Sequence, residues 1–157
     1  MRSDIIVRAA SRADIATITA WQVAMAKETE GINLDIATVT RGVTHVFDTP
    51  TTGYYLIAEK GTKASGCMLV LSEWSDWRAG TVLWLHSVYI EPELRNLGIF
   101  KALYEHVKNQ VTTDKTLCGI RLYVDKSNKI AATAYRNLGL SSEHYELMEW
   151  MPQAPLA

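Results

Sequence analysis

The sequence is poor in cysteine, phenylalanine and proline, with two, two and four of these residues among 157. Cys67 and Cys118 each lie in an apolar stretch, and no Cys-x-x-Cys spacing is present. This pattern favours buried free thiols over a disulfide, a zinc site or a nucleophile. We therefore expect no metal site and assign the two cysteines no function.

The chain also lacks an excess of charge of either sign. Its 16 lysines and arginines oppose 17 aspartates and glutamates, which gives a formal net charge of -1. Without a basic field, nothing argues for binding to nucleic acid or to an anionic membrane surface. No apolar run approaches the ~20 residues that a membrane-spanning helix needs, and the N-terminus has no signal-peptide core. We expect a cytoplasmic protein.

Two common nucleotide-binding loops are missing as well. The sequence contains no Gly-x-x-x-x-Gly-Lys-Ser/Thr, and no Gly-x-Gly-x-x-Gly follows a predicted strand. A P-loop or Rossmann-type nucleotide site is therefore disfavoured. The length suits one domain with a sizeable core, so residues 1–157 are expected to form a single domain.

Apolar periodicity predicts a strand, two helices, three strands, a helix, a strand, a helix and a final strand. The expected strands are 5–8, 54–59, 65–72, 82–90, 117–124 and 144–151, and the helices begin after Ser11, Asp35, Gly98 and Asn128. A helix between strands 82–90 and 117–124 makes these two strands parallel, whereas hairpins join the earlier ones. The fold class is therefore α/β with a central mixed sheet, of about six to seven strands flanked by about four helices.

One segment is built to hold a phosphate. The residues from Arg95 to Phe100 read Arg-Asn-Leu-Gly-Ile-Phe and lie where a predicted strand gives way to a helix. The first backbone N–H groups of a helix are unpaired and carry partial positive charge, so an anion binds there readily. Gly98 allows close approach of a ligand, and Arg95 adds a cation. An ordinary strand-to-helix turn is the alternative.

A second segment begins about thirty residues later, at Asn128. Asn128 is a good helix N-cap, Ala131, Tyr135 and Leu138 share one helix face, and Gly139 suits the position after the helix. Taken alone, the segment would be an amphipathic helix with a core tyrosine.

Together the two segments resemble the signatures of the GCN5-related N-acetyltransferase (GNAT) family. The first matches an Arg/Gln-x-x-Gly-x-Gly/Ala pattern, except that Phe100 stands where the family usually has a small residue. The second matches Asn-x-x-Ala-x-x-x-Tyr-x-x-x-Gly-Phe/Leu at every defined position. The element order is also that of the family, and the resemblance covers nearly the whole chain. It implies the acyl-CoA N-acyltransferase fold, a single acetyltransferase domain and acetyl-CoA as cofactor.

The resemblance also implies how the cofactor is held. The backbone of strand residues 88–90 would pair with the pantetheine arm, and the amides of the turn would take the pyrophosphate. The implied cofactor-binding residues are Val88, Tyr89, Ile90, Arg95, Asn96, Leu97, Gly98, Ile99, Phe100, Lys101, Asn128 and Tyr135.

Candidate catalytic groups are Tyr135 and His86. Tyr135 falls where the family often places a tyrosine beside the coenzyme sulfur, and a phenol can protonate the departing thiolate; otherwise it is a core tyrosine. His86 titrates near neutral pH and would be the general base, although a lone histidine in an apolar strand is more often structural. Glu73, Asp76 or water are the other candidate proton acceptors.

The acceptor site is expected to be acidic. Glu28 and Glu30 end the first helix, in the segment that frames the acceptor pocket in the family, and Glu73 and Asp76 precede strand 82–90. These carboxylates would attract a cationic amine, and Trp74 or Trp77 could offer it an aromatic face. A solvated polar surface is the alternative for each glutamate.

The sequence thus predicts an N-acetyltransferase that moves acetyl directly from acetyl-CoA to a primary amine of a small cationic molecule. Direct transfer is favoured because no cysteine or serine lies in a nucleophile setting. The alternative is a catalytically silent sensor that binds coenzyme A or acyl-CoA. The tryptophans that are not in the core would suit packing in a homodimer.

Overall fold

The computed structural model describes residues 4–152. The chain divides into two compact units, which within the described residues are 4–122 and 123–152. The expectation of one acetyltransferase domain over residues 1–157 stays a prediction. Across residues 4–152, no helix has both the length and the hydropathy needed to cross a membrane.

The first unit is built on a mixed sheet of five strands in the order β1-β2-β3-β4-β5. The strands are β1 (Ile5–Ala9), β2 (Gly53–Lys60), β3 (Lys63–Ser75), β4 (Gly80–Ile90) and β5 (Leu117–Leu122). Pairing is antiparallel from β1 to β4, and β4 pairs with β5 in parallel. The predicted mixed sheet is confirmed, but the expected count of six to seven strands was too high for the part of the chain that the structure describes.

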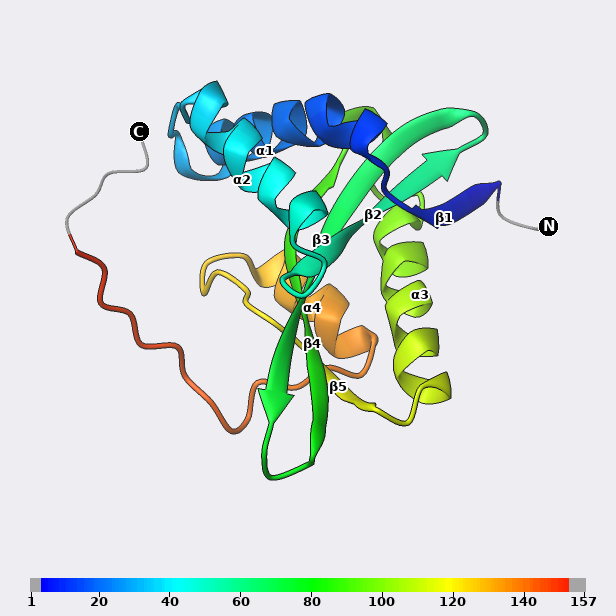
Figure 1. The fold of residues 1–157 in the computed structure, drawn as a ribbon, viewed down its shortest axis with the longest axis vertical. Coiled ribbons are helices and arrows are strands. Elements are labelled where there is room, and N and C mark those ends of the chain that lie inside the picture. Colours follow the sequence, from blue (N-terminus) through cyan, green and yellow to red (C-terminus); the bar gives the residue numbers. More distant parts are fainter. Residues whose placement is uncertain (1–3, 153–157) are drawn as a thin grey trace. The chain divides into compact units, whose positions relative to one another are not determined.

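Three helices flank this sheet. They are α1 (Ile15–Glu30), α2 (Ile36–Asp48) and α3 (Ile99–Thr113), with short 3-10 turns at Arg12–Asp14 and Pro92–Leu94. Helices α1 and α2 lie together on one side of the sheet, and α3, the crossover between β4 and β5, lies on the other (Figure 1). Because only a short turn separates β4 from α3, the start of α3 lies close to the end of β4.

The core on the α1 and α2 side is mostly apolar. Ile18 and Trp21 of α1 pack with Val43 of α2 and with Ile57 and Cys67 of the sheet, all of them 5% exposed or less. Alternate residues of the same strands point to the α3 side, because successive side chains in a strand face opposite ways. The sheet is therefore buried on both faces at its centre.

The second unit contains one helix, α4 (Lys129–Asn137). Asn128 caps it by accepting a hydrogen bond from the backbone N–H of Ala131 at 3.0 Å. Gly139, at φ +92°, donates its N–H to the carbonyl of Arg136 at 2.9 Å. Both ends of the predicted helix are confirmed, because caps depend on local backbone chemistry.

The predicted final strand at residues 144–151 was wrong. These residues form no strand in the structure, and their side chains are exposed, including Met148 at 92% and Trp150 at 84%. Alternating polarity favours extended backbone, but a strand also needs a neighbour to take its N–H and C=O groups. The alternation alone therefore did not make a sixth strand.

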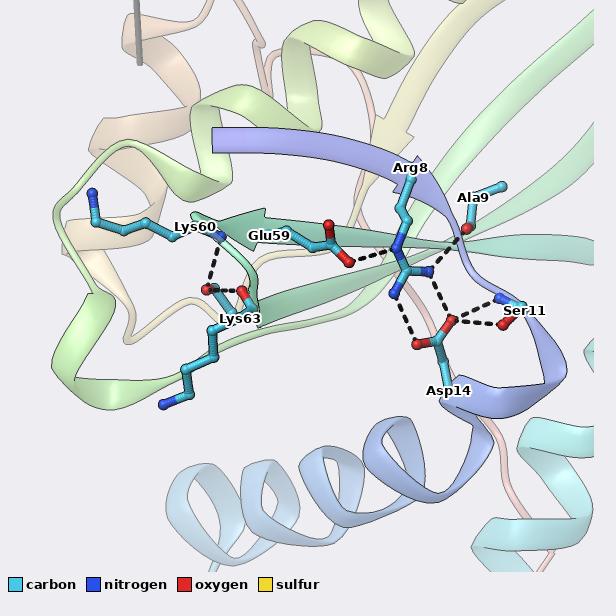
Figure 2. Close-up of polar contacts among 8 residues, drawn as sticks. Arg8, Ala9, Ser11, Asp14, Glu59, Lys60 and Lys63 are labelled. Atoms are coloured by element: carbon cyan, nitrogen blue, oxygen red, sulfur yellow. Dashed lines mark hydrogen bonds and ion pairs between the residues drawn. The ribbon is translucent and has the colours of Figure 1, made fainter. Parts of the chain in front are cut away.

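An ion network fixes the entry to α1 (Figure 2). Arg8 of β1 donates to both carboxylate oxygens of Asp14, at 2.8 and 3.0 Å, and to Glu59 of β2 at 2.7 Å. The Asp14 carboxylate also accepts from the backbone N–H of Ser11 at 2.7 Å. The hydrogen bond from Arg8 holds the pKa of Asp14 below its usual value of 3.8.

We predict that Asp14→Asn lowers the free energy of unfolding by about 1–2 kcal/mol at pH 7, since a charge-assisted network is broken. A depressed folded pKa contributes stability that is present above the unfolded pKa and is lost as pH falls through the folded value. In urea unfolding, the difference in free energy of unfolding between wild type and variant should therefore decrease as the pH falls below about 4. Asp48→Asn, in the exposed Arg12–Asp48 pair, is the control and should cost less than about 1 kcal/mol. Equal losses for the two variants would contradict the assignment.

Candidate active site

Strand β4 carries a bulge just before its end. Cys67 of β3 pairs with Tyr89, but Leu69 pairs with His86, so one residue of β3 opposes two of β4. Ser87 takes φ +51°, which is unusual for a residue with a side chain. A bulge bends its strand and redirects the backbone beyond it. Residues 88–90, which the resemblance assigns to the pantetheine arm, therefore lie immediately after a bend.

The turn after β4 has the form expected of a phosphate site. Asn96 and Gly98 take φ +64° and +86°, and both are exposed. The first intrahelical bond of α3 joins the N–H of Ala102 to the carbonyl of Gly98 at 3.0 Å. The N–H groups of residues 99–101 precede it, at the positively polarised end of a 15-residue helix. A Cβ added at Gly98 would meet nothing within 4 Å, so the turn is open to a ligand.

Phe100, the departure from the family pattern, packs along its own helix. Its ring lies 6.3 Å from that of Tyr104, at an interplanar angle of 25°. Tyr104 is buried, and Ile99 beside Phe100 is 1% exposed. Buried Ile99 therefore anchors the first turn of α3, Phe100 packs against the next turn of the same helix, and Lys101 is exposed.

Arg95 links this turn to the end of α1. Its two terminal nitrogens donate to the two carboxylate oxygens of Glu28, and its Nε donates to the carbonyl of Ile90 at 3.0 Å. The guanidinium also lies 5.7 Å from the centre of the Tyr89 ring. The hydrogen bond to Arg95 lowers the pKa of Glu28. Glu28 and Arg95, assigned from the sequence to acceptor and cofactor respectively, thus form one ion pair.

A cleft of about 220 Å³ opens between the end of α1 and the end of β4. Its lining is mostly apolar, with the Glu28–Arg95 pair as its charged part. The lining residues are Met25, Glu28, Thr29, Val88, Tyr89, Ile90 and Arg95. Four of the residues predicted to bind cofactor therefore share one concave surface with a residue predicted to bind the acceptor.

A second group of polar residues crosses strands β3, β4 and β5 on the side of the sheet where α1 and α2 lie. His86 is half-buried, and its ring lies 6.0 Å from that of Trp84. Arg121 of β5 lies 6.0 Å from the centre of the Trp84 ring and donates to Glu73 of β3 at 2.6 Å. Burial lowers the pKa of His86 below 6.5. A neutral imidazole at pH 7 can accept a proton.

Trp84 and Arg121 were missed by the sequence reasoning. Their signal was an arginine within the otherwise apolar strand at residues 117–122, at the register position opposite Trp84. That register is set by the β4–β5 pairing, which sequence periodicity does not give. The Arg121 side chain brings positive charge to Glu73, so this predicted acceptor carboxylate also belongs to an ion pair.

The other predicted acceptor residues are not gathered in one place. Glu30 is exposed at the last position of α1. Trp74 and Asp76 lie at the tip of the β3–β4 hairpin, which extends away from α1 (Figure 1). Trp74 is 66% exposed, and the Asp76 carboxylate accepts from the N–H of Trp77 at 2.9 Å. The hairpin tip and the end of α1 are therefore separate surfaces.

Asn128 and Tyr135 belong to the second unit. Asn128 acts as the cap of α4, and Tyr135 lies in the helix itself, half-buried. Burial raises the pKa of the Tyr135 hydroxyl above its usual value of 10.0, so the phenol keeps its proton at neutral pH. Within the described residues, no group of three or more His, Cys, Asp or Glu side chains is arranged to hold a metal ion.

Comparison with known proteins agrees with this geometry. Residues 19–140 match the acetyltransferase (GNAT) family model. The crystal structure of a possible acetyltransferase from Clostridium difficile 630 is 35% identical, with a TM-score of 0.88, and the match covers 96% of this chain and 99% of that chain. No curated protein sequence matches the chain.

Two more distant structures share the fold. A predicted acetyltransferase with acetyl-CoA from Clostridium acetobutylicum is 18% identical, with a TM-score of 0.72, over 92% of this chain and 96% of that chain. An aminoglycoside acetyltransferase from an uncultured soil metagenomic sample, in complex with sisomicin, is 14% identical, with a TM-score of 0.72, over 96% and 97%. The family model spans most of the chain, and the 35% identical structure is matched over nearly its whole length. The chain therefore belongs to the GNAT family of acetyltransferases.

Proposed function

We propose that the protein transfers an acetyl group directly from acetyl-CoA to a primary amine of a small cationic molecule. The observation that carries this proposal is the open turn at Gly98, whose space and helix N-terminal donors fit a pyrophosphate. The turn directly follows the bulged end of β4. The structure of the Clostridium acetobutylicum relative, described with acetyl-CoA, supports the same cofactor here.

The cofactor would be held by residues 88–90 and by the turn from Arg95 to Lys101. The amides at the start of α3 would donate to the pyrophosphate, and the extended backbone after the bulge would pair with the pantetheine arm. Arg95 places a guanidinium beside the turn but shares its charge with Glu28, so it mainly fixes the turn against α1. Asn128 caps the helix that carries Tyr135. Acetyl-CoA supplies the activated thioester.

The protein's own groups would manage the protons. His86 accepts the proton that the amine loses as its nitrogen bonds to the acetyl carbon. Tyr135 donates a hydrogen bond, and then a proton, to the sulfur as the carbon–sulfur bond breaks. No covalent enzyme intermediate is needed. Cys67 is unsuited to forming one, because burial raises the pKa of its thiol to about 12.

The acceptor is proposed to be a cationic amine. Glu28 and Glu73 each carry a positive partner, so Glu30 at the end of α1 and Asp76 at the hairpin tip are two separate candidates for attracting the cation. Trp74, on the same hairpin as Asp76, offers an exposed aromatic face. The shared fold of an aminoglycoside acetyltransferase supports a small-molecule amine as acceptor.

The experiment that tests this function measures free-thiol release with saturating acetyl-CoA and a panel of polyamines, aminoglycosides, amino acids and peptide N-termini. We expect release with at least one small cationic amine, and a KM for it that rises with salt. Cofactor binding without release for any acceptor would instead make the protein a coenzyme A or acyl-CoA sensor. If the protein failed to bind acetyl-CoA, both the transferase and the sensor function would be refuted.

We predict that Gly98→Glu reduces acetyl-CoA affinity at least roughly 100-fold, because it places a carboxylate where phosphate must sit. The matched control is Gly61→Glu, in the β2–β3 turn. Gly61 is also exposed, has φ +63° and would place a Cβ in open space. In both variants, a side chain at positive φ should lower the free energy of unfolding by a similar amount, about 1–2 kcal/mol. Calorimetry should show binding lost only in Gly98→Glu; equal affinity in the two folded variants would remove the phosphate site.

Tyr135→Phe should leave acetyl-CoA affinity unchanged and lower kcat on the order of 10- to 10,000-fold, since the hydroxyl acts only as charge develops on sulfur. Steady-state kinetics on the acceptor found above measure this. Tyr145→Phe, at an exposed tyrosine of the same unit, is the control and should match wild type. An unaltered kcat in Tyr135→Phe would show that another group supplies the proton.

For His86, we predict that kcat/KM falls as pH drops through a value below 6.5, because the imidazolium form cannot accept the proton of the amine. The lowered pKa keeps the base neutral over a wider range of acid pH. His86→Gln should abolish this acid limb along with most of the rate, whereas His45→Gln, at an exposed position of α2, should retain both. An identical limb in His86→Gln would assign the titration to another group.

A further inference from the structure

Gln22 is a buried polar side chain whose partners lie on β3 and β4. It sits on α1 with 8% of its surface exposed. Its Nε2 donates to the carbonyl of Ser87 at 3.3 Å and lies 3.6 Å from the sulfur of Cys67. Burial of an amide among apolar side chains is unfavourable unless its hydrogen bonds are made. Apolar packing alone therefore does not explain a glutamine at this position.

The carbonyl that Gln22 holds belongs to the bulged residue. Ser87 has no ladder partner in the β3–β4 register, and its φ is +51°. Such a conformation is strained in a residue with a side chain and persists only where the surroundings enforce it. The Gln22 amide supplies a donor to the carbonyl that the bulge turns toward α1. The Ser87 carbonyl is half-buried and also has a weaker contact from the Cys67 thiol at 3.9 Å, so the Gln22 amide is its stronger donor.

The residue before Gln22, Trp21, makes a hydrogen bond just after residues 88–90, the predicted cofactor segment. Trp21 donates its Nε1–H to the carboxylate of Glu91 at 2.8 Å, and its ring stacks on Tyr89 at 5.9 Å. Two successive residues of α1 therefore contact Ser87, within β4, and Glu91, the residue after the end of β4. The three residues between these contacts are 88–90.

We propose that Gln22 is a positioning residue for acetyl-CoA, which acts by holding the Ser87 carbonyl so that the bulge persists and residues 88–90 present their backbone to the cofactor. The proposal rests on the function proposed above. Without the bulge, the register after Ser87 slips by one residue, and every later side chain and backbone group of the strand turns to the opposite side. Gln22 itself need not touch the cofactor.

The test compares two substitutions of nearly equal length. Gln22→Met keeps the volume but removes the donor, and acetyl-CoA affinity measured by calorimetry should fall about tenfold or more. Gln22→Glu removes the donor only while ionised, because a protonated carboxyl donates and a carboxylate cannot. Its affinity relative to wild type should therefore recover as pH falls from 8 toward 5, whereas that of Gln22→Met should not. Cys67, the titratable group in contact with Gln22, stays a thiol throughout, since burial raises its pKa to about 12.

The control is Gln110→Met on α3. Gln110 is half-buried and accepts a hydrogen bond from the hydroxyl of Tyr54 at 2.6 Å. Its loss should lower stability but leave acetyl-CoA affinity unchanged, which separates a general loss of stability from a loss of positioning. Wild-type affinity in Gln22→Met, or equal pH dependence of Gln22→Met and Gln22→Glu, would overturn the proposal.

Amide hydrogen exchange, measured without cofactor, tests the role of Gln22 independently of the proposed function. In Gln22→Met, the amides of residues 88–90 should exchange at least roughly fivefold faster, and those of β2 should exchange as in wild type. Failure of the wild-type protein to bind acetyl-CoA would refute the proposed function, and exchange would then decide the role of Gln22 alone. Unchanged exchange at residues 88–90 would refute that role.

Discussion

The structure of the first unit depends on β4, which must stay hydrogen-bonded to its neighbours and also bend near its end. It pairs with β3 on one side and with β5 on the other, which joins the five strands into one sheet. At Ser87, however, the pairing with β3 is interrupted and the strand bends. The Ser87 carbonyl, which the bend releases from the ladder, is half-buried and accepts a hydrogen bond from Gln22 of α1. Helix α1 therefore acts as a hydrogen-bonding partner as well as an apolar cover.

The same strand determines where the turn of α3 lies. Parallel pairing of β4 with β5 requires a crossover, and α3 is that crossover, so its N-terminus comes shortly after Ile90. The donors of the helix and the bent strand are thus adjacent by topology, without any special contact between them. Arg95 then fixes the intervening turn through bonds to Ile90 and Glu28.

Much of this arrangement could be predicted from the sequence, because it depends on local backbone chemistry. Gly98 and Asn128 were identified as helix starts, and each takes a conformation or a hydrogen bond that few residues provide. The strand wrongly predicted at residues 144–151 shows the limit of periodicity. An alternating pattern describes one strand, whereas hydrogen bonding requires two, and the partner is a property of the whole fold.

The ion pairs and the bulge could not be predicted. Glu28 and Arg95 are 67 residues apart, and Glu73 and Arg121 are 48 apart, so only tertiary packing could show that these charges meet. Ser87 carries no marker of a positive φ, which glycine or asparagine would have provided. A serine beside a histidine in an apolar strand was the one trace of the bend.

The pairing of Arg95 with Glu28 also affects how quickly an anionic ligand finds the cleft. Two opposite charges in contact form a dipole, whose field falls off much faster with distance than that of a single cation. With a formal net charge of -1, the chain offers little compensating attraction. Encounter with the proposed polyanionic cofactor would then proceed without long-range steering, in the range of about 10⁵–10⁶ M⁻¹s⁻¹ typical of unsteered association. Selectivity for that cofactor would be exerted after contact, through the residence time that the proposed backbone donors provide.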